Sequence, residues 1–290
     1  TYELMDNYGT GGCGQLGLSL RKISAEYPDH IFVFTDMPEG DITDRRGIAR
    51  LIASEKADAV INCAAYTAVE KAETDEGTAR LVNAEGAGNV ALAAFENGIP
   101  MVHISTDYVF PGTGHLPLKE TDATDPVSVY GRTKLEGERL VEASGCRAAV
   151  IRTAWLYSEF GNNFVKTMLR LGREKGEVKV VCDQVGTPTY ATDLARAAMK
   201  ILGNGVDGFS VYHYTGRGHA SWYDFAVEIF RVAGMDVSVE AIGSDVFPSV
   251  VRRPAYSVLA TDKIFKAGVK VPEWKDSLRE CMKILKNESV

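Results

Sequence analysis

Apolar residues alternate along the first half of the chain between short continuous runs and spaced, helix-like patterns. Each run has the near-continuous hydrophobicity of a strand that is covered on both faces. Between the runs, apolar residues recur every three or four positions, as on one face of a helix. Because each crossover helix must cover a face of the sheet, this succession predicts an α/β fold with a doubly wound parallel sheet. The expected strands are 31–34, 59–62, 101–104 and 148–151, and the expected helices are 46–54, 78–97 and 133–143.

The regular alternation ends after Trp155, and helical patterns then mix with isolated apolar runs. We therefore expect residues 1–157 to form a Rossmann-type, dinucleotide-binding domain. Residues 158–290 are expected to form mainly a smaller C-terminal substrate-binding lobe, with 186–216 returning to the Rossmann sheet. The helices expected here are 163–173, 193–202, 221–232 and 274–285, and the strands are 178–182 and 209–214.

Three glycines, Gly11, Gly14 and Gly17, stand at three-residue spacing around the start of an expected helix at 16–26. Such a turn lets the backbone approach a pyrophosphate at the helix N-terminus, where unpaired N–H groups attract anions. A glycine triplet also occurs in ordinary flexible turns, so the motif alone leaves both interpretations open.

The strand that should precede this turn has an unusual composition. A central parallel strand normally supplies about five buried apolar residues. Residues 2–9 instead include Asp6 and Asn7. This segment indicates either a short, polar first strand or an altered N-terminal sequence.

Asp36 follows the second expected strand, about 20 residues beyond the glycine turn, at the place typical of a ribose-binding acid. An acidic side chain there can bind the 2′-hydroxyl of an adenosine ribose. Its charge would repel a 2′-phosphate and so favours NAD, although a nearby Arg45 or Arg46 would soften that preference. A turn or capping aspartate is the competing interpretation.

Tyr130 and Lys134 stand four residues apart, and Thr106 lies in a hydroxyl-rich segment upstream of them. Positions i and i+4 share one face of a helix, so the lysine ammonium can approach the phenol and lower its pKa from ~10. Tyr130 would then exchange a proton with a substrate oxygen, which indicates redox chemistry on a carbonyl or an alcohol. The spacing is common, and an incidental pair on a surface helix is the competing interpretation.

Composition and charge narrow the range of partners. The chain has 290 residues, 45% of them apolar, with a net charge of -7 and no run of lysine or arginine. We therefore expect a packed core and no nucleic-acid partner. No apolar run approaches the ~18 residues of a membrane span, and no signal-peptide pattern is seen, so we expect no membrane partner and a cytoplasmic location. The five cysteines are widely spaced and lack zinc-site spacing, which favours reduced thiols.

Together these residues resemble those of the extended short-chain dehydrogenases/reductases, and within that superfamily the dTDP-4-dehydrorhamnose reductases. The resemblance runs in order from the glycine turn into the C-terminal lobe. The matching segments are 11–17, 62–73 (NCAAYTAVEKAE), 103–112 (HISTDYVFPG), 130–138 (YGRTKLEGE), 152–157 (RTAWLY), 183–189 and 253–259.

The resemblance implies reduction of a 4-keto sugar nucleotide, dTDP-4-dehydro-6-deoxy-L-mannose, to dTDP-L-rhamnose with NADPH or NADH. It implies that Tyr130 donates a proton, that Lys134 holds the nicotinamide ribose and acidifies the tyrosine, and that Thr106 orients the carbonyl oxygen. Arg253 is a further candidate for the substrate pyrophosphate, with a structural salt bridge as its alternative. The expected cofactor-binding residues are Gly11, Gly14, Gln15, Leu16, Gly17, Asp36, Asp41, Ile42, Ala65, Tyr66, Thr67, Tyr130 and Lys134, and the expected substrate-binding residues are Val69, Thr106, Asp107, Trp155 and Arg253.

Two departures from the family pattern limit what is carried over. Tyr66 stands where relatives often carry histidine, and Ser19 stands where some carry a glutamate associated with a dimer-bridging magnesium ion. We therefore expect no metal site from this resemblance, and it does not decide whether the protein forms a homodimer. Two alternatives also stay open, an NAD-retaining nucleotide-sugar epimerase or dehydratase and a noncatalytic nucleotide-binding regulatory subunit. Dehydratases of this group usually place further acidic residues beside the threonine, whereas Tyr108 follows Asp107 here, which favours a reductase.

Overall fold

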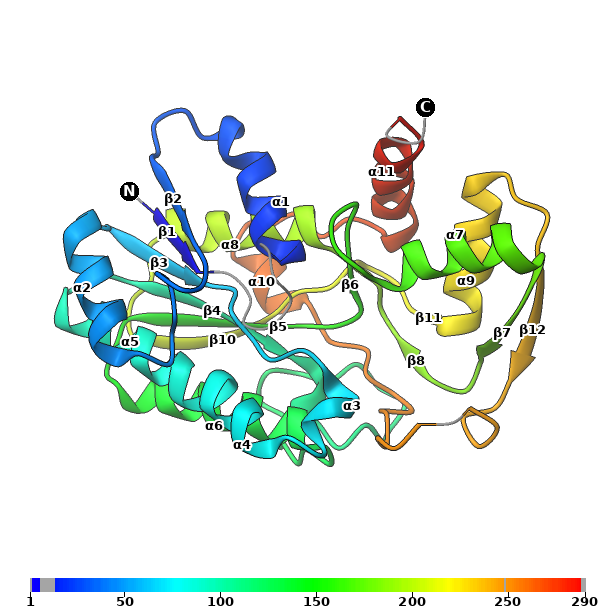
Figure 1. The fold of residues 1–290 in the computed structure, drawn as a ribbon, viewed down its shortest axis with the longest axis horizontal. Helices are drawn as coiled ribbons and strands as arrows, with labels where there is room; N and C mark the ends of the chain where they lie inside the picture. Colours follow the sequence, from blue (N-terminus) through cyan, green and yellow to red (C-terminus); the bar gives the residue numbers. More distant parts are fainter. Residues whose placement is uncertain (1, 6–13, 248, 288–290) are drawn as a thin grey trace.

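The structure is a computed structural model that describes residues 2–5, 14–247 and 249–287. Its main element is a parallel sheet of six strands in the order β2-β1-β3-β4-β5-β10 (Figure 1). The chain leaves β1 toward β2 on one side and then returns to place β3 on the other side. This doubly wound order confirms the predicted fold class, and it leaves a crevice at the carboxyl ends of the strands, where such sheets bind ligands. The strands are β1 (Tyr2–Met5), β2 (Phe32–Thr35), β3 (Ala59–Asn62), β4 (Met101–Thr106), β5 (Ala148–Thr153) and β10 (Phe209–His213).

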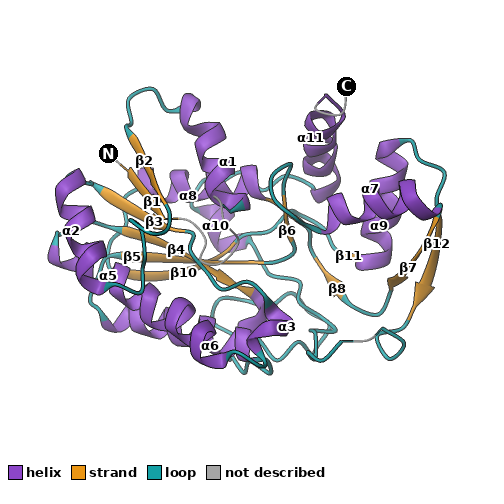
Figure 2. Cartoon of the chain, viewed as in Figure 1, coloured by secondary structure: helices purple, strands orange, loops and turns teal. Residues whose placement is uncertain are grey.

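Helices cover both faces of this sheet (Figures 1 and 2). Neighbouring residues of β3 point to opposite faces, so Val60 enters one apolar core and Ile61 the other. The strand is fully buried, which explains its continuous hydrophobicity. The Val60 side is covered by α2 (Arg45–Glu55), α5 (Ala87–Glu96) and α6 (Val129–Ala143), and the Ile61 side by α1 (Gln15–Ile23), α8 (Ala191–Gly203) and α10 (Asp262–Lys266).

The C-terminal part forms a smaller lobe beside the carboxyl ends of the sheet (Figure 1). Its core is rich in aromatic rings, among them Tyr157, Phe225 and Trp274. β10 pairs in parallel with β5, so this late strand belongs to the main sheet. The division of the chain at residue 157 stays a prediction. The lobe contains α7 (Phe164–Lys175), α9 (Trp222–Ala233), α11 (Trp274–Asn287), the parallel pair β7 (Glu177–Val181) and β12 (Ser238–Ile242), and the two-residue strands β6 (Leu156–Tyr157), β8 (Val185–Gly186), β9 (Thr189–Tyr190) and β11 (Ala220–Ser221).

Several element bounds differ from the predicted ones. The first strand is short, since β1 has four residues, and it pairs in parallel with β2 and β3. Asp6 and Asn7 lie outside the described residues. α6 begins at Val129 instead of residue 133, because the Ser128 side chain caps it by accepting a hydrogen bond from the Gly131 N–H at 3.1 Å. The predicted helix 78–97 is divided into α4 (Glu76–Arg80), a π-helical turn η2 (Leu81–Gly86) and α5.

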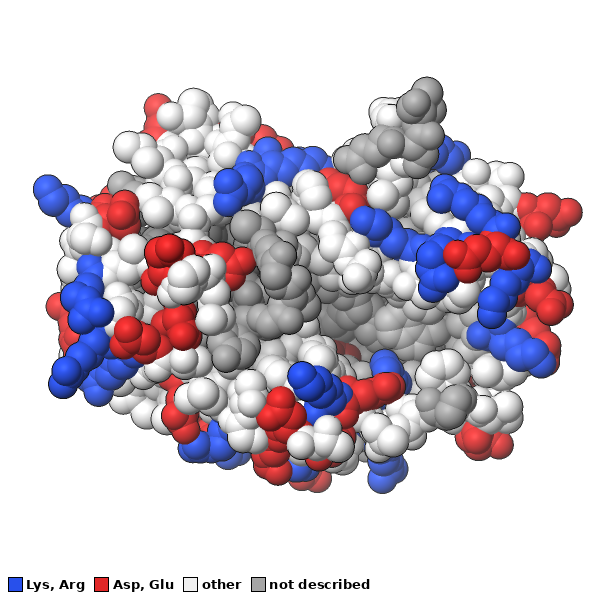
Figure 3. Space-filling model, viewed as in Figure 1, with Lys and Arg blue, Asp and Glu red and all other residues white. Residues whose placement is uncertain are grey.

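Acidic and basic side chains are interspersed on the face shown in Figure 3, and they form no basic stripe on it. Within the described ranges, no helix combines the length and the apolar character needed to cross a bilayer. Cys146 and Cys182 are free thiols, while Cys13 lies outside the described residues.

Candidate active site

A cavity of about 650 Å³ lies at the carboxyl ends of the central strands, within the size range of cofactor and substrate pockets. It is lined by the start of α1, by the segments that follow β3, β4 and β5, and by the loop before α7. Tyr130 and Lys134 both reach it from α6, so the pair faces the cavity, as the spacing predicts. The predicted residues in its wall are Gly14, Gln15, Leu16, Ala65, Thr67, Val69, Thr106, Asp107, Tyr130, Lys134 and Trp155.

A glycine lets the start of α6 approach the turn that follows β4. A Cβ added at Gly131 would lie 2.2 Å from the carbonyl oxygen of Tyr108, so no larger residue fits there. The neighbouring rings of Tyr108 and Tyr130 meet edge to face, with centroids 5.5 Å apart. This close approach brings Tyr130 next to Thr106, whose side chain is hydrogen-bonded to the phenol.

The pKa of the Tyr130 phenol is raised, which corrects the expectation that Lys134 would lower it. Burial is the main cause, and the Thr106 hydrogen bond opposes it in part. The Lys134 ammonium instead donates a hydrogen bond to the carbonyl oxygen of Ile104 at 2.7 Å. The phenol is therefore protonated at neutral pH.

Lys134 is deeply buried, with 2% of its surface exposed. Burial lowers its pKa to about 8, and the charges of Glu138 and Cys63 oppose that effect. The ammonium therefore stays largely protonated at pH 7, as a cation on the cavity wall.

Thr106 ends β4 and is held by its neighbours in η3 (Asp107–Val109). Its Oγ1 accepts a hydrogen bond from the Tyr108 N–H at 3.2 Å and donates one to Asp107 Oδ1 at 3.0 Å. Burial raises the pKa of Asp107 to about 6, although nearby Ser257 and Thr106 oppose the shift. A hydroxyl, a phenol and a carboxyl group thus meet at one end of the cavity.

Some predicted cofactor residues lie away from the cavity wall. The Ile42 side chain belongs to the apolar core and is 2% exposed. The Tyr66 N–H donates to Asn83 Oδ1 at 2.8 Å, which fixes the backbone between Ala65 and Thr67. The cofactor roles of these residues stay predictions, and Gly11 lies outside the described residues. The predicted residues away from the wall are Gly17, Asp36, Asp41, Ile42 and Tyr66.

Asp36 directly follows β2 and is half-buried. Its Oδ1 accepts a hydrogen bond from the Met37 N–H at 2.8 Å, and burial raises its pKa. Arg45 forms an exposed ion pair with Glu96 at 3.2 Å. Arg45, one of the two arginines expected to soften the charge of Asp36, therefore already has an acidic partner.

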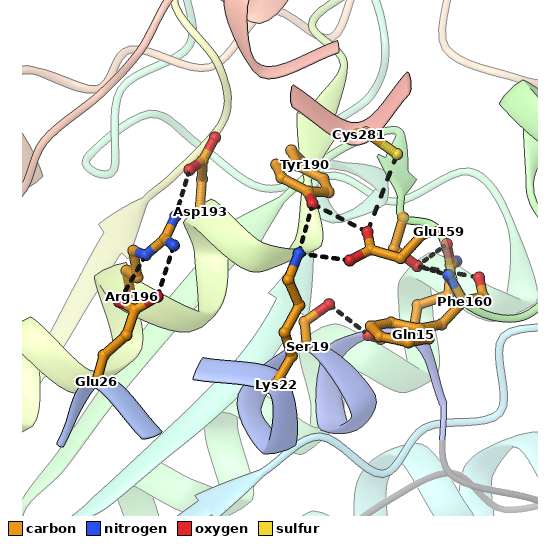
Figure 4. Close-up of polar contacts among 11 residues, drawn as sticks. Gln15, Ser19, Lys22, Glu26, Glu159, Phe160, Tyr190, Asp193, Arg196 and Cys281 are labelled. Atoms are coloured by element: carbon orange, nitrogen blue, oxygen red, sulfur yellow. Dashed lines mark hydrogen bonds and ion pairs between the residues drawn. The ribbon is translucent and has the colours of Figure 1, made fainter. Parts of the chain in front are cut away.

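One contact that the sequence did not predict joins α1 to the C-terminal lobe. Gln15 Oε1 accepts hydrogen bonds from Ser158 Oγ at 3.1 Å and from Asn163 Nδ2 at 2.9 Å. Asn163 also lines the cavity and caps α7, where its side chain accepts from the Lys166 N–H. The start of α1 is therefore tied to the loop that forms the opposite wall (Figure 4).

A partly buried ionic contact stabilises the same junction (Figure 4). Lys22 Nζ lies 2.6 Å from Glu159 Oε1 and 3.0 Å from the Tyr190 hydroxyl oxygen. Tyr190 in turn donates to Glu159 Oε2 at 2.9 Å. In the 3-10 turn η1 (Ser24–Glu26), which follows α1, Glu26 pairs with Arg196 of α8 at 2.7 Å, but both of these side chains are exposed.

Trp155 has an unusual backbone conformation at the cavity wall. Its φ is 49°, in the left-handed region that bulky residues rarely adopt. Its indole stacks on Trp222 with ring centroids 3.6 Å apart. A Cβ added at Gly186 would lie 2.6 Å from Trp155 Cε2, so glycine makes room for the ring. Such strain persists only where the surroundings hold it, and it is common in ligand sites.

Arg253 lies outside the cavity wall. Its Nη2 pairs with Glu70 Oε1 at 3.0 Å, which is the structural alternative that the sequence left open. Ser19 is fully buried and donates to the Gln15 carbonyl oxygen at 2.8 Å. Within the described part of the chain, no cluster of three histidine, cysteine or acidic side chains could hold a metal ion.

Comparisons with known proteins agree with this geometry. The family model described as RmlD substrate binding domain matches residues 5–287. A dTDP-4-dehydrorhamnose reductase from Aggregatibacter actinomycetemcomitans is 39% identical over 281 residues, which cover 93% of this chain and 96% of the relative. The chain belongs to this family of RmlD-type reductases.

Solved structures of the family share the fold closely. A dTDP-4-dehydrorhamnose reductase from Clostridium acetobutylicum has a TM-score of 0.91 at 43% identity, and the match covers 98% of this chain and 99% of that one. The Bacillus anthracis enzyme, solved in complex with NADP, has a TM-score of 0.90 at 35% identity, with 97% and 99% covered. The family resemblance and the Rossmann-type fold predicted from the sequence are therefore confirmed.

Proposed function

We propose that this protein reduces dTDP-4-dehydro-6-deoxy-L-mannose to dTDP-L-rhamnose with NADPH or NADH, in polysaccharide biosynthesis. The observation that carries the proposal is the meeting of Thr106, Tyr130 and Lys134 in one cavity with the start of the glycine-turn helix. Family membership supports the same chemistry, since relatives over most of the chain are dTDP-4-dehydrorhamnose reductases.

The cavity wall fits a nicotinamide dinucleotide. Gly14 stands at the N-terminus of α1, where free N–H groups favour a pyrophosphate. Lys134 offers a buried ammonium to ribose hydroxyls, and Asp36 stands where an adenosine ribose is expected. When bound, the reduced nicotinamide supplies the hydride. All other steps fall to residues of this chain.

Tyr130 is the proton donor. Its raised pKa keeps the proton on the phenol until a strongly basic alkoxide develops on the substrate. The Thr106 hydroxyl, beside the phenol, orients the carbonyl oxygen toward it. Lys134 is not among the groups that shift the Tyr130 pKa, so its ammonium, on the same cavity wall, is assigned to the cofactor ribose.

The substrate binds on the side of the cavity that faces the C-terminal lobe. Trp155 offers an apolar face beside the reacting groups, and Val69 lines the same cavity. The position of Asp107 next to Thr106 places a carboxyl group within reach of sugar hydroxyls. Arg253 is retained as a candidate for the substrate diphosphate, which would have to compete with Glu70.

One assay tests the proposal. The loss of nicotinamide absorbance is followed with the 4-keto sugar nucleotide, first with NADPH and then with NADH. Stoichiometric oxidation of the cofactor with formation of dTDP-L-rhamnose is expected. Tightly retained NAD with no net oxidation would indicate an epimerase or dehydratase instead. Cofactor binding without turnover across several keto sugars would indicate a regulatory subunit.

Assembly and location remain predictions. The protein is proposed to act in the cytoplasm, where its nucleotide-sugar substrate would be made, and a homodimer is kept as an open prediction. Sedimentation of the purified protein would decide the second point.

A further inference from the structure

A buried ion pair lies one helical turn beyond Lys134. Glu138 on α6 and Arg152 on β5 are 4% and 5% exposed. The guanidinium holds the carboxylate through two nitrogens, with Nη2–Oε2 at 2.7 Å and Nε–Oε1 at 3.0 Å. Apolar residues can often replace such a pair without loss of stability, because burying both charges is costly. Its position beside the catalytic lysine indicates a second role.

Lys134 and Glu138 share one face of α6 and hold consecutive residues of β4. Lys134 donates to the Ile104 carbonyl oxygen at 2.7 Å, and the Ser105 hydroxyl donates to Glu138 Oε1. The next residue of the strand is Thr106. Lys134 and Glu138 together therefore fix the register between α6 and β4, the strand that ends at Thr106.

The groups around the Lys134 ammonium come from several elements. Cys63 follows β3, and His103 lies on β4, where burial keeps its pKa well below the usual range and so keeps it neutral. Arg152 of β5 lies behind Glu138. Among these groups, the Glu138 carboxylate is the largest influence that opposes the effect of burial on Lys134.

We propose that Glu138 is a positioning residue that acts through Lys134, keeping the ammonium charged and in place at the cavity. Arg152 and Ser105 hold the carboxylate in turn. The inference rests on the proposed function, in which a charged Lys134 holds the cofactor ribose. Without the carboxylate, only Cys63 still opposes the effect of burial on the Lys134 pKa, and the proton is lost nearer to neutrality.

A direct titration of Lys134 tests this without cofactor or substrate. In protein labelled with ¹³C at lysine Cε, NMR follows the Lys134 signal, which is assigned by its absence from Lys134→Met. The midpoint is expected near pH 8 in the wild type. In Glu138→Gln it should fall by about one to two pH units, as for charges about 6 Å apart near a protein interior. A midpoint equal to that of the wild type would overturn the proposal.

Glu136→Gln is the matched control. Glu136 lies on the same helix, but its side chain is 37% exposed and pairs with Arg80 at 2.6 Å. Its substitution is expected to leave the Lys134 midpoint unchanged, because solvent screens an exposed charge. A shift as large as that of Glu138→Gln would show that the effect is not specific to Glu138, and would overturn the proposal.

A double variant covers the case in which Glu138→Gln does not fold. The double variant Glu138→Gln/Arg152→Met removes both charges of the ion pair, so no buried charge is left without a partner. The Lys134 midpoint should still fall, since the lost carboxylate is the neighbour that favours the ammonium. An unchanged midpoint in this variant would also overturn the proposal.

Cofactor affinity gives a second readout. The Kd for NADPH, followed by its fluorescence, should be similar in Glu138→Gln and wild type at pH 6 and about tenfold weaker in the variant at pH 8, where far less of its Lys134 is charged. Equal weakening at both pH values would indicate a purely structural role and refute the proposal. A wild type that binds NADPH without reducing the keto sugar would refute the proposed function and leave the titration result standing.

Discussion

A methyl group added at Gly186 would press on the indole of Trp155. The Cβ of Gly186→Ala would lie 2.6 Å from Cε2 and 2.8 Å from both Cζ2 and Nε1. Ordinary carbon contacts are about 3.5–4.0 Å, so the ring must move by roughly 1 Å. Its stacking on Trp222, with centroids 3.6 Å apart, leaves little room for that movement.

Overpacking of this kind costs about 1–3 kcal/mol, which urea denaturation would show as a lower midpoint. Because Trp155 lines the cavity and is proposed to bind the substrate, we expect the shift to displace the substrate as well. A misplacement of about 1 Å can cost up to ~10²-fold in rate, so we expect kcat/KM for the keto sugar to fall by about 10- to 100-fold. The Kd for NADPH should change little, because the cofactor is expected to lie at the other end of the cavity.

Gly77→Ala is the matched control for this substitution. Gly77 lies in α4, and a Cβ added there meets no heavy atom within 4 Å. The same chemical change should therefore stabilise the protein by up to ~1 kcal/mol and leave the kinetics unchanged. Wild-type stability and kcat/KM in Gly186→Ala would refute the described packing of the indole.

Two further predictions concern the ion pairs around α1 and the acidic residue after β2. Lys22→Met leaves the Glu159 carboxylate buried without its cation, so the free energy of unfolding should fall by at least about 2 kcal/mol. The loss should be smaller than the ~3–5 kcal/mol of a wholly buried pair, because Lys22 is 33% exposed. Glu26→Gln, which breaks the exposed pair between the turn after α1 and Arg196 of α8, should cost no more than ~1 kcal/mol. Equal losses in the two variants would contradict this account. Asp36→Asn should shift the ratio of kcat/KM values toward NADPH by about tenfold, since it removes a charge that repels a 2′-phosphate. An unchanged ratio would place the adenosine ribose elsewhere.

Much of the sheet could be predicted from the sequence, because buried parallel strands are apolar on both faces. β3 occupies the predicted residues 59–62, and it is buried at every position. The start of α6 could not be predicted in this way. Instead of a core-facing apolar pattern, its first turn carries Tyr130, which lines the cavity, Gly131, which packs against the turn after β4, and Arg132, which is exposed. The apolar periodicity of the helix is therefore lost where its residues form the site.

The spacing of Tyr130 and Lys134 placed both residues in one cavity, as the structure has them, but it predicted the wrong direction for the shift of the tyrosine pKa. Burial dominates that pKa, and burial depends on the packing of segments far apart in the chain. The contact of Gln15 with Ser158 and Asn163 was missed for the same reason, since it joins residues more than 140 positions apart. No local pattern marks such a contact.

Turnover by Tyr130→Phe tests the central claim most directly, that the phenol in this cavity donates a proton to the reduced sugar. The variant removes one hydroxyl group and keeps the ring that packs against Tyr108. We expect kcat with NADPH and the 4-keto sugar nucleotide to fall by about 10²–10⁴-fold, while the Kd for NADPH stays within about twofold of the wild-type value. A Tyr130→Phe enzyme with the wild-type kcat would contradict the account.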